Sequence, residues 1–446
     1  MKEALYRKKI SRRRALSTAA KVAIGTGVGV VVGALGGYFG ALGSVSPVTS
    51  TVTVKETVKE TVTQAAATTT VTAPASTVTV TKTVTATATQ TVTPSPTTTT
   101  AATATTLTVA PPYTPVKSAN IGYCAPFLRD LGQVAIMIGA KRGADKFKWT
   151  FEFLNADGDV NVQISHMQTW IAKKKDAIFI VPQDAKAISP GVEAANEAGI
   201  PVICIDRAAE KGEILVAVMS DNILAGRQAG EILVEKLKEK YGKPEGYVVE
   251  FLGALGTDVA RMRREGFHEV VEQYPGITIH EVPCEWEPEK ARTALLDIWH
   301  ATGGVDACYS HCDYMSMGVF QALEQLGVLY PVGDPKHVIA VNIDGCPEGL
   351  DALRKGWLDA TIVQPLTDFG VVGAYLLNQW WGGLKFHDGL VIHMPGAKWS
   401  PAVMKEIDNG FKVLCRTWPA TKDNVDDPTN WANDEEVYKT MKELGF

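Results

Sequence analysis

The sequence lacks the short motifs that mark the common enzyme classes. It has no Gly-x-Ser-x-Gly elbow, no Gly-x-Gly-x-x-Gly fingerprint after a strand and no Gly-Lys-Ser/Thr phosphate loop. The eight histidines are dispersed. His311 and Cys312 are neighbours at an expected strand end, but adjacent strand residues point apart, whereas a nucleophile and its base must face each other. The sequence therefore predicts a protein that is not an enzyme.

Cysteine and metal-binding patterns are also scarce. The 446 residues contain seven cysteines, none in a Cys-x-x-Cys pair, and no His pair accompanies them at zinc spacing. We expect most of them to be small buried hydrophobic residues, and we predict no metal and no cofactor. A disulfide is compatible with an exported chain, although the spacing does not define its pairing.

Positive charge is not in excess. With 44 basic and 49 acidic residues the formal net charge is −5, and no basic stripe interleaved with aromatics occurs. Nucleic-acid binding is therefore not predicted. Asn-x-Ser/Thr sequons are absent as well, so N-glycosylation is not implied.

The N-terminus has the charge and hydropathy pattern of a membrane segment. Residues 1–21 are strongly basic, and residues 22–42 are apolar and uncharged over a length that can cross a bilayer. The Ser-Arg-Arg-Arg-Ala-Leu stretch at 11–16 resembles a twin-arginine export signal. We expect residues 1–44 to be an export signal or an uncleaved anchor, and a cleavage site at 41–43 is the alternative.

Residues 45–117 have a different composition. They consist mostly of Thr, Val and Ala with scattered Pro, and they contain no aromatic residue before Tyr113. Such a segment has too little apolar bulk to form a core, and its composition is typical of O-glycosylated stalks. We interpret it as a disordered spacer that holds a domain away from a membrane.

From residue 119 onward, apolar runs of strand length alternate with amphipathic helical stretches. Alternation of this kind predicts parallel sheets covered by helices, and two series of five strands indicate two lobes. We expect strands at 119–124, 149–155, 177–181, 200–206 and 215–219, and then at 247–252, 277–282, 307–309, 338–343 and 360–363. Residues 397–446 fit neither series, and we expect them to pack on a lobe as an extension.

Charged residues stand where several of these strands end. The apolar run 200–205 stops at Asp206 and Arg207, and the run 338–343 stops at Asp344. Ligands of open α/β sheets bind outside the carboxyl ends of the strands. These residues are therefore candidates for a binding crevice, and an exposed ion pair at Asp206–Arg207 is the alternative explanation.

Several separated motifs then occur in a fixed order. They are Gly139-Ala140, Ala144-Asp145-Lys146, the run 200–207, Ser220-Asp221-Asn222, Gly256-Thr257, the run 260–267, the run 342–345, Gly356 and the run 360–364. Together they resemble the sugar-binding receptors of ABC importers, of the ribose-binding-protein type, over residues 119 to 394. The resemblance implies two Rossmann-like lobes that close over a ligand and a chain that crosses between them three times.

The resemblance also sets the expected domain boundaries. Lobe 1 is expected at 118–220 plus 365–393 and lobe 2 at 221–364 plus 394–396, with crossings near Ser220, Gln364 and His393–Pro395. The extension is expected at 397–446.

The same resemblance implies a set of ligand-binding residues. Asp206 and Arg207 would grip hydroxyls from lobe 1, and Arg263 matches the family's second arginine better than Arg261 or Arg264. From lobe 2 and the crossings the resemblance adds Trp286, Asp313, Asp344 and Gln364.

The loop after the first strand departs from the family pattern. The sugar receptors place asparagine and paired phenylalanines there, whereas this chain offers Phe127, Asp130 and Gln133. We expect these three residues to contact the ligand, and we expect the ligand to differ from ribose.

The resemblance implies an extracytoplasmic, monomeric solute-binding protein. It would capture a small polyol, most readily a monosaccharide, and deliver it to the membrane permease of an ABC transporter. A ligand-sensing subunit for a membrane signalling partner and a sugar-processing enzyme are the alternatives. A repressor of the lactose-repressor type shares the fold but needs an N-terminal helix-turn-helix, and here that place holds the membrane segment and the stalk.

Overall fold

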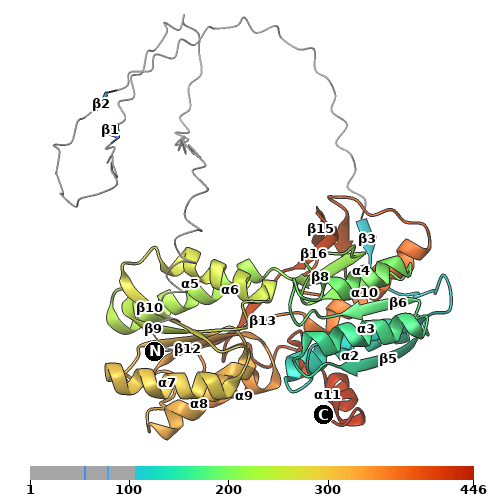
Figure 1. Ribbon diagram of the computed structural model, residues 1–446. Helices are drawn as coiled ribbons and strands as arrows, with labels where there is room; N and C mark the ends of the chain where they lie inside the picture. Colours follow the sequence, from blue (N-terminus) through green and yellow to red (C-terminus); the bar gives the residue numbers. More distant parts are fainter. Residues whose placement is uncertain (1–54, 57–77, 80–105) are drawn as a thin grey trace, which may run out of the picture. The chain divides into compact units, whose positions relative to one another are not determined.

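Two α/β lobes side by side account for most of the chain from residue 106 to its end (Figure 1). The computed structural model describes residues 55–56, 78–79 and 106–446. The chain divides into two units, residues 1–99 and 100–446. Within the first unit, Lys55–Glu56 (β1) pairs antiparallel with Val78–Thr79 (β2). The predicted membrane segment at 22–42 lies outside the described residues, and within these no helix has the length and apolar character to cross a bilayer.

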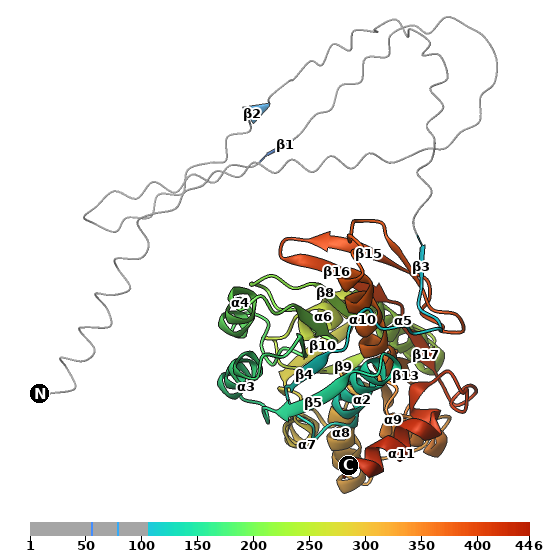
Figure 2. The same ribbon diagram turned by 90° about the vertical axis from the view of Figure 1, so that its right-hand side faces the viewer.

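Lobe 1 is built on a nine-stranded mixed sheet. Its order is β3-β14-β15-β16-β8-β7-β6-β4-β5. Helices α2 and α10 pack together on one face, and α3 and α4 pack together on the other (Figure 2). Strands β6, β7 and β8 are buried along their whole length because helices cover both faces. The strands are β3 (Thr106–Thr108), β4 (Asn120–Ala125), β5 (Thr150–Asn155), β6 (Ala177–Ile180), β7 (Val202–Ile205), β8 (Val216–Ser220), β14 (Val391–His393), β15 (Ala402–Ile407) and β16 (Gly410–Cys415), and the helices are α2 (Leu131–Lys146), α3 (Val160–Ala172), α4 (Ser189–Glu197) and α10 (Leu366–Trp381).

Lobe 2 repeats this design with a six-stranded sheet of order β10-β9-β11-β12-β13-β17. Helices α5 and α6 form a pair, and α8 packs against both α7 and α9. The first five strands are parallel, whereas β17 joins antiparallel to β13. The elements are α5 (Asn222–Tyr241), β9 (Glu245–Leu252), α6 (Asp258–Val271), β10 (Gly276–Pro283), α7 (Pro288–Thr302), β11 (Ala307–Ser310), α8 (Asp313–Gln325), β12 (Ile339–Asp344), α9 (Pro347–Lys355), β13 (Ala360–Val363) and β17 (Trp418–Ala420).

The chain passes between the two sheets three times. Two crossings lie where predicted, between β8 and α5 at Asp221 and between β13 and α10 at Gln364–Pro365. The prediction of a crossing at His393–Pro395 is wrong. The chain stays in lobe 1 there, because β14 pairs with β15 and the β15–β16 hairpin joins β8 through β16. The third crossing is at Arg416–Thr417, between β16 and β17.

The C-terminal residues therefore belong to both lobes. Strand β16 extends the sheet of lobe 1, and β17 extends the sheet of lobe 2, which makes both sheets mixed instead of purely parallel. Beyond β17, the short helix η1 (Trp431–Asn433) packs on α9 of lobe 2, and α11 (Glu435–Glu443) packs on α2 of lobe 1. Arg142 of α2 pairs with Asp434, and Arg354 of α9 pairs with Asp426. The extension bridges the lobes.

Glycines bring one pair of helices into close contact in each lobe. On α5 and α6, a Cβ on Gly226 or on Gly266 would overlap a backbone carbonyl of the other helix. On α2 and α10, a Cβ on Gly139 would lie 2.5 Å from the carbonyl oxygen of Thr367. Helices α5 and α10 each start directly after a crossing, and α6 and α2 each supply residues to the region between the lobes. The glycines therefore fix the distance between the crossings and that region.

We expect Gly226→Ala to destabilise the protein, because overpacking a tight contact costs about 1–3 kcal/mol and the neighbouring backbone cannot move aside. Gly230→Ala on the same helix is the matched control, since its Cβ would meet nothing closer than Val270 Cβ at 3.1 Å. Thermal unfolding should show a larger drop in Tm for the first variant than for the second, whose closest contacts are about 1 Å longer and which gains helix propensity. Equal Tm values for the two variants would contradict the packing argument.

Candidate functional site

A small, mostly filled cavity lies between the lobes, at the carboxyl ends of the central strands. Eight of the ten predicted ligand-binding residues line it: Asp130, Gln133, Asp206, Arg207, Arg263, Trp286, Asp344 and Gln364. Sequence reasoning did not assign Gly132, Ile136, Val259, Cys312 or Leu366 to the lining. These five give no chemical signal of their own, because they are small or apolar, and only the fold brings them to the cavity.

The turn after β7 directs Asp206 and Arg207 toward the cavity. Asp206 has φ of 66°, so the strand ends in a left-handed turn, and its backbone N–H donates to Val218 O over 2.9 Å. Arg207 donates from Nη1 to Pro182 O over 3.3 Å, and its Nε lies 3.5 Å from Asp206 Oδ2. Both side chains are at least nine-tenths buried. The exposed ion pair considered from the sequence is therefore not what the fold contains.

Two aromatic rings flank the guanidinium of Arg207. Its Cζ lies 5.4 Å from the ring centre of Trp286 and 5.7 Å from that of Phe127. Trp286 itself packs closely on Gly253, where a Cβ would overlap the indole. Because only glycine fits beneath the ring, the indole is fixed in place at the cavity wall.

Arg263 enters the cavity from the middle of α6. Its Nε donates to Asn222 Oδ1 over 2.8 Å, and its Nη1 donates to the backbone oxygen of His311 and, over 3.3 Å, to Asp344 Oδ1. His311 is in turn fixed by Glu250, whose Oε1 lies 2.9 Å from its Nε2. A buried hydrogen-bonded network thus holds the arginine in one orientation.

Asp344 ends β12 with φ of 130° and accepts from Gln364 Nε2 at the second crossing. Burial raises the pKa of Asp344 to about 8, although Arg263 acts in the opposite direction. The extension reaches this residue too, because Trp431 Nε1 donates to Asp344 O over 3.0 Å. The C-terminal segment therefore helps to hold the end of β12 in place, although it was expected to be an extension separate from the site.

Four buried polar atoms of the cavity-lining residues have no hydrogen-bond partner among the described residues. They are Gln133 Oε1, Arg207 Nε, Trp286 Nε1 and Gln364 Oε1. Buried polar atoms are rarely left unpaired, since each costs about 1–3 kcal/mol. Two are donors and two are acceptors, which suits a ligand with several hydroxyl groups.

Two predicted residues do not line the cavity. Asp313 accepts from Cys346 N over 2.6 Å and from Thr361 Oγ1 over 3.0 Å, so it fixes the loop that follows β12. Phe127 is buried beside Arg207 and supports that side chain. Both residues therefore contact parts of the structure next to the cavity: the loop after β12 for Asp313 and the side chain of Arg207 for Phe127.

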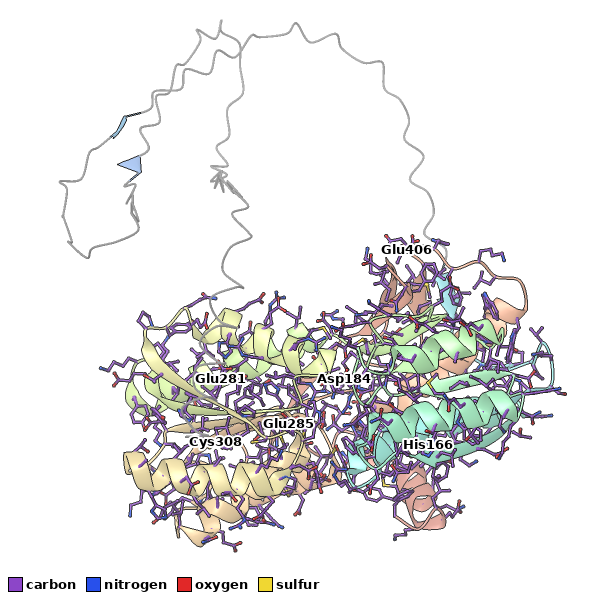
Figure 3. The ribbon with its side chains drawn as sticks, viewed as in Figure 1. His166, Asp184, Glu281, Glu285, Cys308 and Glu406 are labelled. Atoms are coloured by element: carbon purple, nitrogen blue, oxygen red, sulfur yellow. The ribbon has the colours of Figure 1, made fainter. Side chains whose placement is uncertain are left out.

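The lobes also contact each other outside the cavity. Ala185 N donates to Gly256 O over 3.1 Å, and Ala208 N donates to Asp258 Oδ2 over 3.2 Å. Figure 3 shows Asp184, which precedes Ala185, at the junction of the two lobes. Arg261 pairs across the same junction with Glu210 over 3.0 Å. These bonds join the rims of the two lobes around the cavity.

All seven cysteines are buried and free. Burial raises the pKa of Cys204 and of Cys284 to about 12, so both thiols stay protonated at neutral pH. The expectation of small buried hydrophobic residues is confirmed, and the described fold contains no disulfide.

The two lobes, three crossings and interlobe cavity define a two-lobed solute-binding protein. The family model described as "Periplasmic binding protein domain" matches residues 124–385. The ribose import binding protein of Escherichia coli (strain K12) is 30% identical over 240 residues, which cover 54% of this chain and 77% of that protein. The chain belongs to this family, and it is a binding protein of the periplasmic type, not an enzyme.

Other relatives differ in the solute that their names give. The galactofuranose-binding protein of Escherichia coli (strain K12) is 32% identical over 230 residues, covering 50% of this chain and 70% of that protein. Among solved structures, a Mycobacterium smegmatis ABC transporter solute-binding protein with bound glycerol has a TM-score of 0.58 at 26% identity. The structural alignment covers 69% of this chain and 96% of that protein. A carbohydrate transporter protein from Agrobacterium radiobacter in complex with D-arabinose has a TM-score of 0.60 at 23% identity, covering 71% and 99%, and shows the shared fold.

Proposed function

We propose that the cavity captures a small polyol, most readily a monosaccharide, outside the cytoplasm and delivers it to the permease of an ABC transporter. The observation that carries this proposal is the convergence of eight polar or aromatic residues from both lobes on one cavity. Four unpaired polar atoms among them would be satisfied by hydroxyl groups. The relatives named for ribose and galactofuranose support the solute class.

The proposed mechanism is closure of the lobes on the ligand. Asp206 and Arg207 belong to lobe 1, whereas Arg263 and Asp344 belong to lobe 2, so a ligand touches both pairs only when the lobes meet. A ligand with higher affinity for the closed arrangement shifts the population toward it. The bonds across the rim, such as that from Ala208 to Asp258, would form in the same step. The closed form would be the state that a permease recognises.

The N-terminal residues would keep the binding domain at the membrane. Residues 22–42 are uncharged and follow a basic stretch, and Thr-rich residues 45–105 precede β3 (Thr106–Thr108). The spacer expected to reach residue 117 ends earlier, because β3 pairs with β14 in the sheet of lobe 1. This pattern supports an anchor followed by a spacer. Tethering would keep a captured solute close to its permease.

Arg263→Ala should weaken binding of the tightest ligand in a panel of sugars and polyols at least tenfold. Losing a hydrogen bond to a charged group costs about 1.5–3 kcal/mol, and each 1.4 kcal/mol is about a factor of ten in affinity. Arg264→Ala, which removes the exposed partner of Glu281, is the matched control and should leave the affinity unchanged. Isothermal titration calorimetry measures both.

Three results would count against the proposal. They are equal affinities for the two variants, absence of binding across the whole panel, and chemical turnover of a panel member. The first contradicts the assignment of the cavity, and the other two contradict the binding function.

The anchor has its own test. The full chain should sediment with membranes, and a variant lacking residues 1–44 but carrying a cleavable export signal should appear in the soluble fraction. A mature protein whose first residue lies after position 43 would show that the segment is removed and would contradict tethering through it.

A further inference from the structure

The cavity contains more negative than positive groups. Three carboxylates (Asp130, Asp206 and Asp344) and two guanidiniums (Arg207 and Arg263) line it, and each of these residues is at most 6% exposed. A fourth carboxylate stands directly behind Asp130. The side-chain oxygens of Asp130 and Glu348 and the Sγ of Cys346 all lie within 4.8 Å of one another. Four carboxyl groups therefore lie at or next to the cavity, together with only two guanidinium groups.

No other cation of the described fold compensates for the difference. Arg129, in the loop next to Asp130, pairs with Glu287 on the surface and does not line the cavity. His311 is held by Glu250, and burial lowers the pKa of its imidazole, which disfavours the charged form. Buried charges without a partner are costly, so the excess carboxylates require either protons or a cation from outside the protein.

The internal hydrogen bonds of two amide side chains leave their oxygens facing the cavity. Gln133 Nε2 donates to Asp206 Oδ2 over 3.2 Å, and Gln364 Nε2 donates to Asp344 Oδ1. Since both amide nitrogens are used in this way, both amide oxygens remain as unpaired acceptors.

The carboxylates provide further free acceptors. Asp130 accepts from Gly132 N through Oδ1 over 2.7 Å, and Asp206 and Asp344 are hydrogen-bonded through Oδ2 and Oδ1 respectively. Each of the three carboxylates therefore has one oxygen outside the hydrogen bonds of the described residues. Five acceptors, three of them on carboxylates, are therefore free, and the free donors are Trp286 Nε1, Arg207 Nε and the remaining N–H groups of the two guanidiniums.

Ionisation of the acidic groups is correspondingly unfavourable with protein groups alone. Burial, reinforced by the charge of Asp130, raises the pKa of Glu348 to about 7. Burial also raises the pKa of Asp130 above its ordinary value. A positive group among these carboxylates would let them ionise at neutral pH.

We infer that the ligand is a polyol that carries a protonated amine, such as an amino sugar or an amino alditol. An ammonium group donates three hydrogen bonds and accepts none, so it can bond the free carboxylate oxygens and offset the excess negative charge together. Its place is beside Asp130, with Glu348 behind, while the hydroxyl groups bond Arg207, Trp286 and the two amides. This inference rests on the proposed function and narrows its ligand class.

The test compares amino compounds with their neutral parents by calorimetry on the full-length protein at pH 7. The pairs are D-glucosamine and D-glucose, D-galactosamine and D-galactose, and glucamine and D-sorbitol, with D-ribose, D-arabinose and xylitol as further neutral probes. EDTA is present throughout, so that no divalent cation supplies the charge. We expect the tightest ligand to be an amine that binds at least tenfold more tightly than its parent.

Glu348→Gln separates charge from shape. Removing this negative charge should reduce the amine-to-parent affinity ratio severalfold. Asp351→Asn, at an exposed residue of the same helix that pairs with Lys355, is the matched control and should leave the ratio unchanged.

The outcomes distinguish this inference from the proposed function. Neutral parents that bind as tightly as their amines, or a ratio that Glu348→Gln does not change, would overturn the amine and leave the polyol-binding function standing. If no member of the panel binds, the proposed function fails and the inference fails with it.

Discussion

The structure depends on the burial of two acid–base pairs that face each other from separate lobes. Asp206 and Arg207 end a strand of lobe 1, and Arg263 and Asp344 stand opposite them in lobe 2. Buried ions are tolerated only when hydrogen bonds satisfy them, and their mutual attraction rarely exceeds the desolvation penalty. These ion pairs therefore contribute little to the free energy of unfolding. The proposed polar ligand would account for their presence, because it would complete their hydrogen bonding when the lobes meet.

The surrounding helices and the C-terminal segment hold these side chains in position. Helices α5 and α10 begin at two of the crossings, and each packs through glycines on the helix that supplies Arg263 or Gln133. Glu250 and His311 fix Arg263 from behind, and Trp431 of the extension bonds the backbone of Asp344. The C-terminal segment, which contributes a strand to each sheet, is therefore part of the hinge region and not an appendage on one lobe.

The sequence predicted the regular elements well because each gives a local signal. Helix α5 (Asn222–Tyr241), for example, begins at a capping Asp221 and ends at Gly242 in a left-handed conformation. The acids at the ends of β7 and β12 were likewise visible, because an apolar run that stops at a charge marks a buried strand end. The third crossing was not predictable, since nothing local tells which sheet edge β16 or β17 joins. Asp313 and Phe127 show a second limit, because a residue that supports the site has the same sequence signal as one that touches a ligand. Glu348 gave no signal, because only the fold brings it behind Asp130.

The central claim is that a ligand is held by both lobes at once, and the distance between the lobes tests it most directly. Glu193 on α4 and Glu265 on α6 are exposed residues on opposite lobes, and spin labels on cysteines at these positions leave the seven buried native thiols untouched. Double electron–electron resonance on the full chain should give a broad interspin distribution without ligand. With a saturating amount of the tightest-binding polyol or amino polyol of the panel, it should give a shorter and narrower one. A distribution that saturation leaves unchanged would contradict capture between the lobes.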